Sequence, residues 1–264
     1  MKIKKTRIYS SDIAVDVFYR RDIDFSKKNQ AVIILPGFPD FIGASAMTNY
    51  QVSLGNIVFQ PHIRGTFDSA GEFSPHGIKE SFVAVNHMIN NATGSKVPNG
   101  QQENQPWSIS DIILVGHSFG GIMALRFFSE IQNLKTLIFT SPALHYSSEY
   151  GCKEIGPEHY NDVKRKYPFT YRLAPLSSWH GILEGNDPLP SYPLGKVDNV
   201  LIMYGMEDKY FDLASVSETA KHLVESYVSS QNCTLFLVKG AGHPVAELLS
   251  NEKAIEILDS ICKG

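Results

Sequence analysis

The sequence is poor in cysteine and carries no strong charge of either sign. Its three cysteines, Cys152, Cys233 and Cys262, form no C-x-x-C pair and no metal-ligand spacing, which argues against a disulfide framework and favours a reducing compartment. The formal net charge of −3 gives no basic field that would attract nucleic acid or an anionic membrane. We therefore expect neither nucleic acid nor a membrane as a partner.

Long apolar runs are also missing. No stretch approaches the ~20 residues of a membrane-spanning helix, and the first ten residues, MKIKKTRIYS, are charged and lack the apolar core of a secretory signal. The 264 residues are 43% hydrophobic and 19% charged, which is ordinary for a soluble globular protein with a large core. These features predict a soluble, cytoplasmic protein.

The most informative stretch is DIILVGHSFGG, residues 111–121. Its apolar run, Ile112–Val115, predicts a strand buried on both faces, and the residues after it have the apolar spacing of a buried helix. The G-x-S-x-G pattern between them places Ser118 as a nucleophile at a strand-to-helix turn, where the glycines allow close approach. The amide of Phe119 then lies at the helix N-terminus, which favours an oxyanion. The alternative is a glycine-rich turn with a solvated serine.

In this context nearly the whole chain resembles the α/β-hydrolase superfamily. An upstream R-G-x-x-x-S loop with Arg64, Gly65 and Ser69 is similar to that of serine esterases of the feruloyl-esterase and monoacylglycerol-lipase type, although His62 and Phe67 depart from the pattern. The resemblance implies an α/β fold: a mostly parallel central sheet, helices on both faces and a cap inserted after the sixth strand. In the family this loop is mainly structural, which favours an ion-pairing scaffold role for Arg64 over a substrate contact.

Apolar patterns predict where the elements lie. The predicted strands cover residues 2–9, 13–19, 31–35, 56–60, 112–115, 134–140, 199–204 and 232–238. The predicted helices cover residues 43–54, 78–91, 122–128, 212–229 and 244–263, and the polar segment 93–108 is predicted to be a surface loop. The core domain then comprises 1–142 and 198–264, and an aromatic-rich cap comprises 143–197. The cap aromatics either line an acyl or aryl pocket or pack only against one another.

Two further loops supply the partners that the resemblance implies for a catalytic triad. Asp208 matches the family's triad acid in the turn after a predicted strand, with Glu207 and Asp212 as competitors, and His243 matches the triad histidine after the last strand. The order Ser118, Asp208, His243 is that of α/β hydrolases. Because each residue follows a predicted strand, all three would project from the carboxyl edge of one sheet, where such sheets bind ligands.

The loop after the third predicted strand resembles the family's oxyanion loop. Pro36 stands in place of the usual histidine, Gly37 is kept, and the amide of Phe38 becomes the second oxyanion donor beside that of Phe119. A turn that simply ends a strand is the alternative reading of this loop.

Together these motifs predict a serine hydrolase that cleaves a carboxylic ester of a small or medium, apolar or aromatic acyl substrate through an acyl-enzyme. The chemistry needs no metal or organic cofactor. An epoxide or haloalkane hydrolase is disfavoured, since it needs an aspartate in place of Ser118. A ligand-binding protein without hydrolysis, a thioesterase and a C–C bond hydrolase stay open as alternatives.

Overall fold

The computed structural model describes residues 1–143, 157–179, 195–211, 213, 221–222, 224–226 and 228–262. Within these residues eight strands form one sheet, in the order β1 (Ile3–Ser10), β2 (Ile13–Arg20), β4 (Ile57–Pro61), β3 (Lys28–Leu35), β7 (Ser108–His117), β8 (Leu134–Thr140), β9 (Gly195–Gly205) and β10 (Val228–Val238). The strands from β4 to β10 are parallel, and β2 pairs antiparallel with both β1 and β4. The predicted hairpin and mostly parallel sheet are confirmed.

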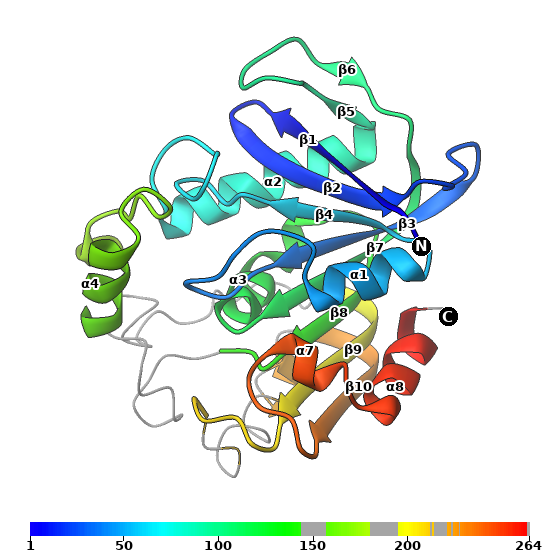
Figure 1. The fold of residues 1–264 in the computed structure, drawn as a ribbon, viewed down its shortest axis with the longest axis vertical. Coiled ribbons are helices and arrows are strands. Elements are labelled where there is room, and N and C mark those ends of the chain that lie inside the picture. The colour runs from blue at the N-terminus through cyan, green and yellow to red at the C-terminus, as the bar shows by residue number, and fades with distance from the viewer. Residues whose placement is uncertain are drawn as a thin grey trace.

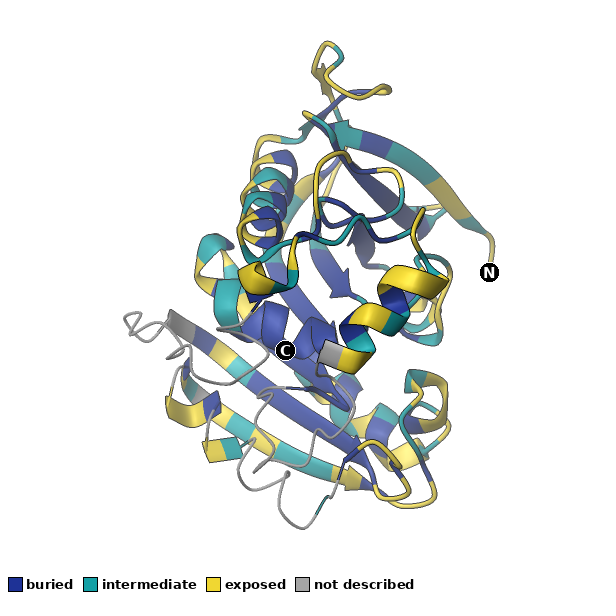
Figure 2. Ribbon diagram, turned by 90° about the vertical axis from the view of Figure 1, so that its left-hand side faces the viewer, coloured by how far each residue is buried: buried dark blue, intermediate teal, exposed yellow. Residues whose placement is uncertain are grey.

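Helices cover both faces of this sheet (Figure 1). One face is covered by α2 (Pro75–Asn91) and α3 (Phe119–Phe127), and the other by α1 (Ala46–Ser53), α7 (Val245–Leu248) and α8 (Glu252–Cys262). Successive side chains of a strand point to opposite faces, so Ile33 of β3 packs in the first layer and Val32 in the second. Figure 2 shows the central strands buried along most of their length. Both faces are therefore closed, and the strand ends are left for a site.

Two of the predicted helices near the C-terminus are wrong in part. The predicted helix 212–229 overlaps β10, because Val228 and Ser229 pair with Gly195 and Lys196 of β9; most of that predicted helix lies outside the described residues. The predicted helix 244–263 is divided into α7 and α8. The side chain of Asn251 accepts a hydrogen bond from the Ala254 amide, 3.2 Å away, and so caps the start of α8.

The predicted surface loop 93–108 contains a short hairpin, formed by β5 (Thr93–Gly94) and β6 (Glu103–Asn104). The hairpin adds to the edge of the main sheet, since Tyr9 and Ser95 exchange two backbone hydrogen bonds of 2.8 and 2.9 Å. The pairing involves polar residues and a backbone contact far along the chain, so no apolar pattern could indicate it.

The predicted cap is described only in its middle, because residues 144–156 and 180–194 lie outside the described residues. The described part holds α4 (Pro157–Lys166) and a short 3-10 helix, Leu176–Trp179. The division into a core domain and a cap stays a prediction, although β9 already begins at Gly195, inside the predicted cap. None of the described helices is long and apolar enough to cross a membrane.

Candidate active site

Ser118 sits at the sharp turn between β7 and α3. Its backbone angles are φ 51° and ψ −119°, a conformation that is strained for a residue with a side chain. A Cβ on Gly116 would lie 2.4 Å from the carbonyl oxygen of Gly120, and a Cβ on Gly120 would lie 2.3 Å from that of Leu35. The close approach that the G-x-S-x-G pattern predicts is therefore present, and only glycine fits at these two positions.

Asp208 and His243 meet at the ends of two neighbouring strands, β9 and β10. His243 Nδ1 lies 2.8 Å from Asp208 Oδ2, and the carboxyl side chain is fully buried. The other oxygen, Oδ1, accepts a 2.9 Å hydrogen bond from the Tyr210 amide. Because Nδ1 donates to the carboxylate, Nε2 is left as the proton acceptor of the ring. Of the two competing acids, Glu207 is exposed and Asp212 lies outside the described residues.

Ser118 and His243 face one cavity of about 330 Å³. The His117 ring, next to Ser118 in the chain, has its centroid 5.0 Å from that of His243. Among the described residues, His243 is hydrogen-bonded to Asp208, and no hydrogen bond joins it to the Ser118 hydroxyl. Such bonds between nucleophile and base are often loose without substrate and tighten in the reacting complex.

The cavity wall combines aromatic side chains with polar ones. Phe38, Tyr210 and Phe211 supply the aromatic part, and Asp40 and His159 supply polar atoms beside them. No motif in the sequence predicts a role for Asp40, His159, Tyr210 or Phe211. Tyr210 and Phe211 directly follow the Asp208 turn, so their place in the chain was a usable signal. His159 lies on α4, and no local pattern marks it.

Within residues 37–41, directly after β3, every backbone N–H but one has a hydrogen-bond partner. The Gly37 amide donates to Asp40 Oδ2 at 3.3 Å, the Asp40 amide to the Tyr171 hydroxyl at 2.9 Å, and the Phe41 amide to Asp40 Oδ1 at 2.7 Å. The amide of Phe38 has no partner among the described residues. A buried or half-buried N–H without a partner is uncommon and calls for an acceptor that is supplied from elsewhere.

This loop and the Ser118 turn are in contact. A Cβ on Gly37 would lie 3.3 Å from the Cβ of Ser118, and Phe119, the residue after the serine, is the first residue of α3. The rings of Phe38 and Phe119 pack with centroids 5.4 Å apart. The structure thus places both candidate oxyanion amides on segments that adjoin Ser118.

His117 is a half-buried histidine whose charge state is set by its surroundings. Burial, and secondarily repulsion by His243, lowers the pKa of His117 from its ordinary value of 6.5 to about 4. Its Nδ1–H donates to the Thr140 carbonyl oxygen at 2.9 Å. His117 is therefore neutral near pH 7 and adds no positive charge beside His243.

Arg64 lies outside the cavity and forms ion pairs, as its expected scaffold role requires. Its guanidinium contacts Asp12 at 2.7 Å and Glu80 at 2.8 Å. Asp12 lies between β1 and β2, and Glu80 lies on α2. Arg64 thus ties the R-G-x-x-x-S loop to the sheet edge and to a helix.

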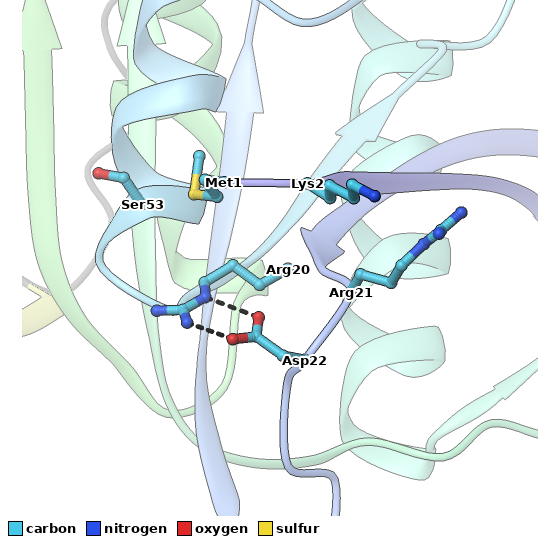
Figure 3. A pocket seen from close by; sticks show the side chains of 6 residues that line it. All are labelled: Met1, Lys2, Arg20, Arg21, Asp22 and Ser53. Carbon is cyan, nitrogen blue, oxygen red and sulfur yellow. Dashed lines mark hydrogen bonds and ion pairs between the residues drawn. The ribbon is translucent and has the colours of Figure 1, made fainter.

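A second hollow, of about 690 Å³, opens near the N-terminus and is drawn in Figure 3. Arg20 and Asp22, which both line it, form an ion pair through two hydrogen bonds of 2.5 and 3.0 Å, while Arg21 points away from them. Among the described residues that line it there is no histidine or cysteine. It therefore lacks the combination of serine and histidine that lines the smaller cavity. No group of three or more metal-ligating side chains occurs among the described residues.

Comparison with known proteins identifies the fold. No protein-family model matches the sequence, and no curated protein sequence matches it. Esterase Pf2001 of Pyrococcus furiosus is 18% identical, with a TM-score of 0.63 over 99% of this chain and 90% of that chain. Esterase EaEST of Exiguobacterium antarcticum is 20% identical, with a TM-score of 0.61 over 99% of this chain and 100% of that chain. Est1E of Butyrivibrio proteoclasticus, solved with ferulic acid bound, is 18% identical, with a TM-score of 0.58 over 98% of this chain and 100% of that chain.

At these identities the likeness establishes the fold alone. The chain has the α/β-hydrolase fold that its sequence predicts, with the mostly parallel sheet and its two helical layers.

Proposed function

We propose that the protein is a serine hydrolase that cleaves carboxylic esters through an acyl-enzyme. The observation that carries the proposal is the 2.8 Å contact between Asp208 Oδ2 and His243 Nδ1, at a cavity that Ser118 also lines. The likeness of the fold to three esterases supports it.

Ser118, His243 and Asp208 have distinct roles in this mechanism. Nε2 of His243 accepts the hydroxyl proton while Ser118 Oγ attacks the carbonyl carbon, and Asp208 holds the imidazole tautomer and stabilises the imidazolium. The bond to the alcohol oxygen then breaks, and the proton passes from His243 to the leaving alcohol. Water, deprotonated by His243, attacks the acyl carbon. The Ser118 Oγ–acyl bond then breaks, the proton passes from His243 back to Oγ, and the acid is released.

The developing negative charge would be held by the amides of Phe38 and Phe119. The unpartnered Phe38 N–H supports this role, and Phe119 lies at the positive end of α3. In other hydrolases removal of one such donor raises the barrier by roughly 3–4 kcal/mol. Neither step requires a metal or an organic cofactor.

The cavity supports a small or medium substrate with an apolar or aromatic acyl group. The cavity offers about 330 Å³, with Phe38, Tyr210 and Phe211 in its wall, and this volume lies at the small end of the usual range for ligand sites. Among the described residues that line it there is no lysine or arginine, so it offers no strong attraction for an anionic acyl group. Residues 143–197 are proposed to form the cap, because His159 reaches the cavity from α4.

Turnover of p-nitrophenyl esters with short and medium acyl chains tests the function. We expect the protein to release p-nitrophenol and Ser118→Ala to release none above background. Acyl thioesters and β-diketones assayed in parallel separate ester hydrolysis from thioester and C–C bond cleavage. An intact protein without turnover of any of these compounds would leave the ligand-binding alternative.

A further inference from the structure

The described part of the proposed cap, residues 157–179 (the cap segment), contacts the loop after β3 that carries Phe38 (the oxyanion loop). The contacts are to the backbone at two places. Tyr171 accepts a hydrogen bond from the Asp40 amide and donates one to the Asp40 carbonyl oxygen, both at 2.9 Å. His159 Nε2 lies 3.0 Å from the Phe38 carbonyl oxygen, which it can reach only as a donor. The two contacts hold the peptide groups on either side of Pro39. The orientation of the Phe38 N–H depends on the same stretch of backbone.

Aromatic packing adds to these hydrogen bonds. The Phe38 ring packs edge-on against two rings, that of Tyr171, with centroids 5.1 Å apart, and that of His159, with centroids 5.6 Å apart. Tyr171 is only 4% exposed, and burial raises the pKa of its hydroxyl, so the group keeps its proton and remains a donor. Tyr171 does not belong to the cavity lining.

The backbone around Tyr171 is hydrogen-bonded to a neighbouring loop. The segment 170–174 runs beside the loop 65–73, with three backbone hydrogen bonds of 2.7 to 2.8 Å, namely Phe67 amide to Thr170, Arg172 amide to Gly65 and Phe73 amide to Arg172. The Arg172 guanidinium also donates to the carbonyl oxygens of Phe67 and Ser69. That loop is in turn tied down by the ion pairs of Arg64.

We infer that Tyr171 and His159 are positioning residues, which hold the Phe38 amide in the direction that binds the oxyanion. This inference rests on the proposed ester hydrolysis. It assigns to the R-G-x-x-x-S loop and to the segment 157–179 a shared purpose, namely to fix the loop that carries Phe38. Displacement of a catalytic group by about 1 Å can lower the rate of an enzyme about 100-fold, so the position of the Phe38 amide matters for the rate.

Tyr171→Phe tests the inference, because it removes both hydrogen bonds to Asp40 and keeps the ring. We expect kcat for p-nitrophenyl esters to fall about 10- to 100-fold with KM changed less than about twofold. Affinity for an aryl trifluoromethyl ketone, whose adduct with Ser118 carries an oxyanion, should fall by a similar factor. Ground-state binding and the midpoint of thermal unfolding are measured alongside.

Tyr160→Phe is the matched control. Tyr160 is 5% exposed, and its hydroxyl donates to the Ala174 carbonyl oxygen. The variant therefore also loses one buried hydroxyl of the segment 157–179, but it keeps the contacts of Tyr171 with Asp40 and of His159 with Phe38. It should keep kcat and ketone affinity near the wild-type values. Equal kcat losses in both variants would mean a general loss of cap structure and would overturn the inference.

His159 gives a second pair of variants in case Tyr171→Phe is unstable. His159→Gln keeps an N–H donor at a similar reach and should retain most of kcat, whereas His159→Phe keeps a ring without the donor and should lose it. If the wild-type protein is active and both Tyr171→Phe and His159→Phe keep full activity, this inference is overturned and the proposed function stands. Wild-type protein without ester turnover would overturn the proposed function, and this inference with it.

Discussion

Asp208 and His243 are 35 residues apart in the chain, yet Oδ2 of the acid lies 2.8 Å from Nδ1 of the histidine. The register of the sheet explains this contact, because Gly205 at the end of β9 pairs with Val238 at the end of β10. The turns that follow β9 and β10 are joined by a 2.8 Å hydrogen bond from the Glu207 amide to the Ala241 carbonyl oxygen. The acid is thus placed by two adjacent parallel strands and by direct contact between their turns.

Replacement of this acid tests its role. Asp208→Asn should keep the fold and lower kcat by roughly 10⁴-fold, because the amide no longer fixes the required tautomer of His243. Glu207→Gln, at the exposed neighbouring position, should keep kcat within about twofold, and so should Asp212→Asn. A large loss in Asp212→Asn with an active Asp208→Asn would assign the acid to Asp212.

The contact between the two turns should depend on a glycine. A Cβ on Gly205 would lie 2.2 Å from the Gly242 carbonyl oxygen, and both groups are backbone, so neither can move aside cheaply. Gly205→Ala should lower the free energy of unfolding in urea by about 1–3 kcal/mol or more and also reduce activity. Gly43→Ala is the control, since nothing lies within 4 Å of a Cβ there, and its unfolding curve should match the wild type. Wild-type stability of Gly205→Ala would show that the turns are not packed as described.

Stability should fall in mild acid because of His117. Its pKa is about 4 in the folded protein and 6.5 ordinarily, so between these pH values the unfolded chain binds more protons than the folded one. The stabilising contribution is fully present above pH 6.5 and is lost as the pH falls toward 4, with a slope of up to about 1.4 kcal/mol per pH unit. Urea unfolding from pH 4 to 7 should give a shallower pH dependence for His117→Gln. Parallel curves for the two proteins would contradict this assignment.

Much of the candidate site could be predicted because its residues stand at strand ends. Apolar runs marked the strands before Ser118, Asp208 and His243, and the parallel topology brings such ends to one edge. The loop with Phe38 follows another of these runs. In each case the signal was local, a buried strand and then a short turn of glycine and polar residues.

The features of the site and fold that could not be predicted depend on contacts between residues far apart in the chain. His159 reaches Phe38 over 121 positions and Tyr171 reaches Asp40 over 131, and neither residue lies in a recognisable motif. Val228 and Ser229 join β10 through pairing with β9, although a helical pattern leads up to them. Tertiary pairing overrides local preference at such positions.

The central claim is that Ser118 is a nucleophile activated by His243. Its most direct test is covalent labelling with a fluorophosphonate, followed by intact-mass and peptide mass spectrometry of wild-type, Ser118→Ala and His243→Ala proteins. We predict one adduct per chain on Ser118 in the wild type, none in Ser118→Ala and strongly slowed labelling in His243→Ala. Folded wild-type protein that remains unlabelled at Ser118, or that labels at another residue, would contradict the account.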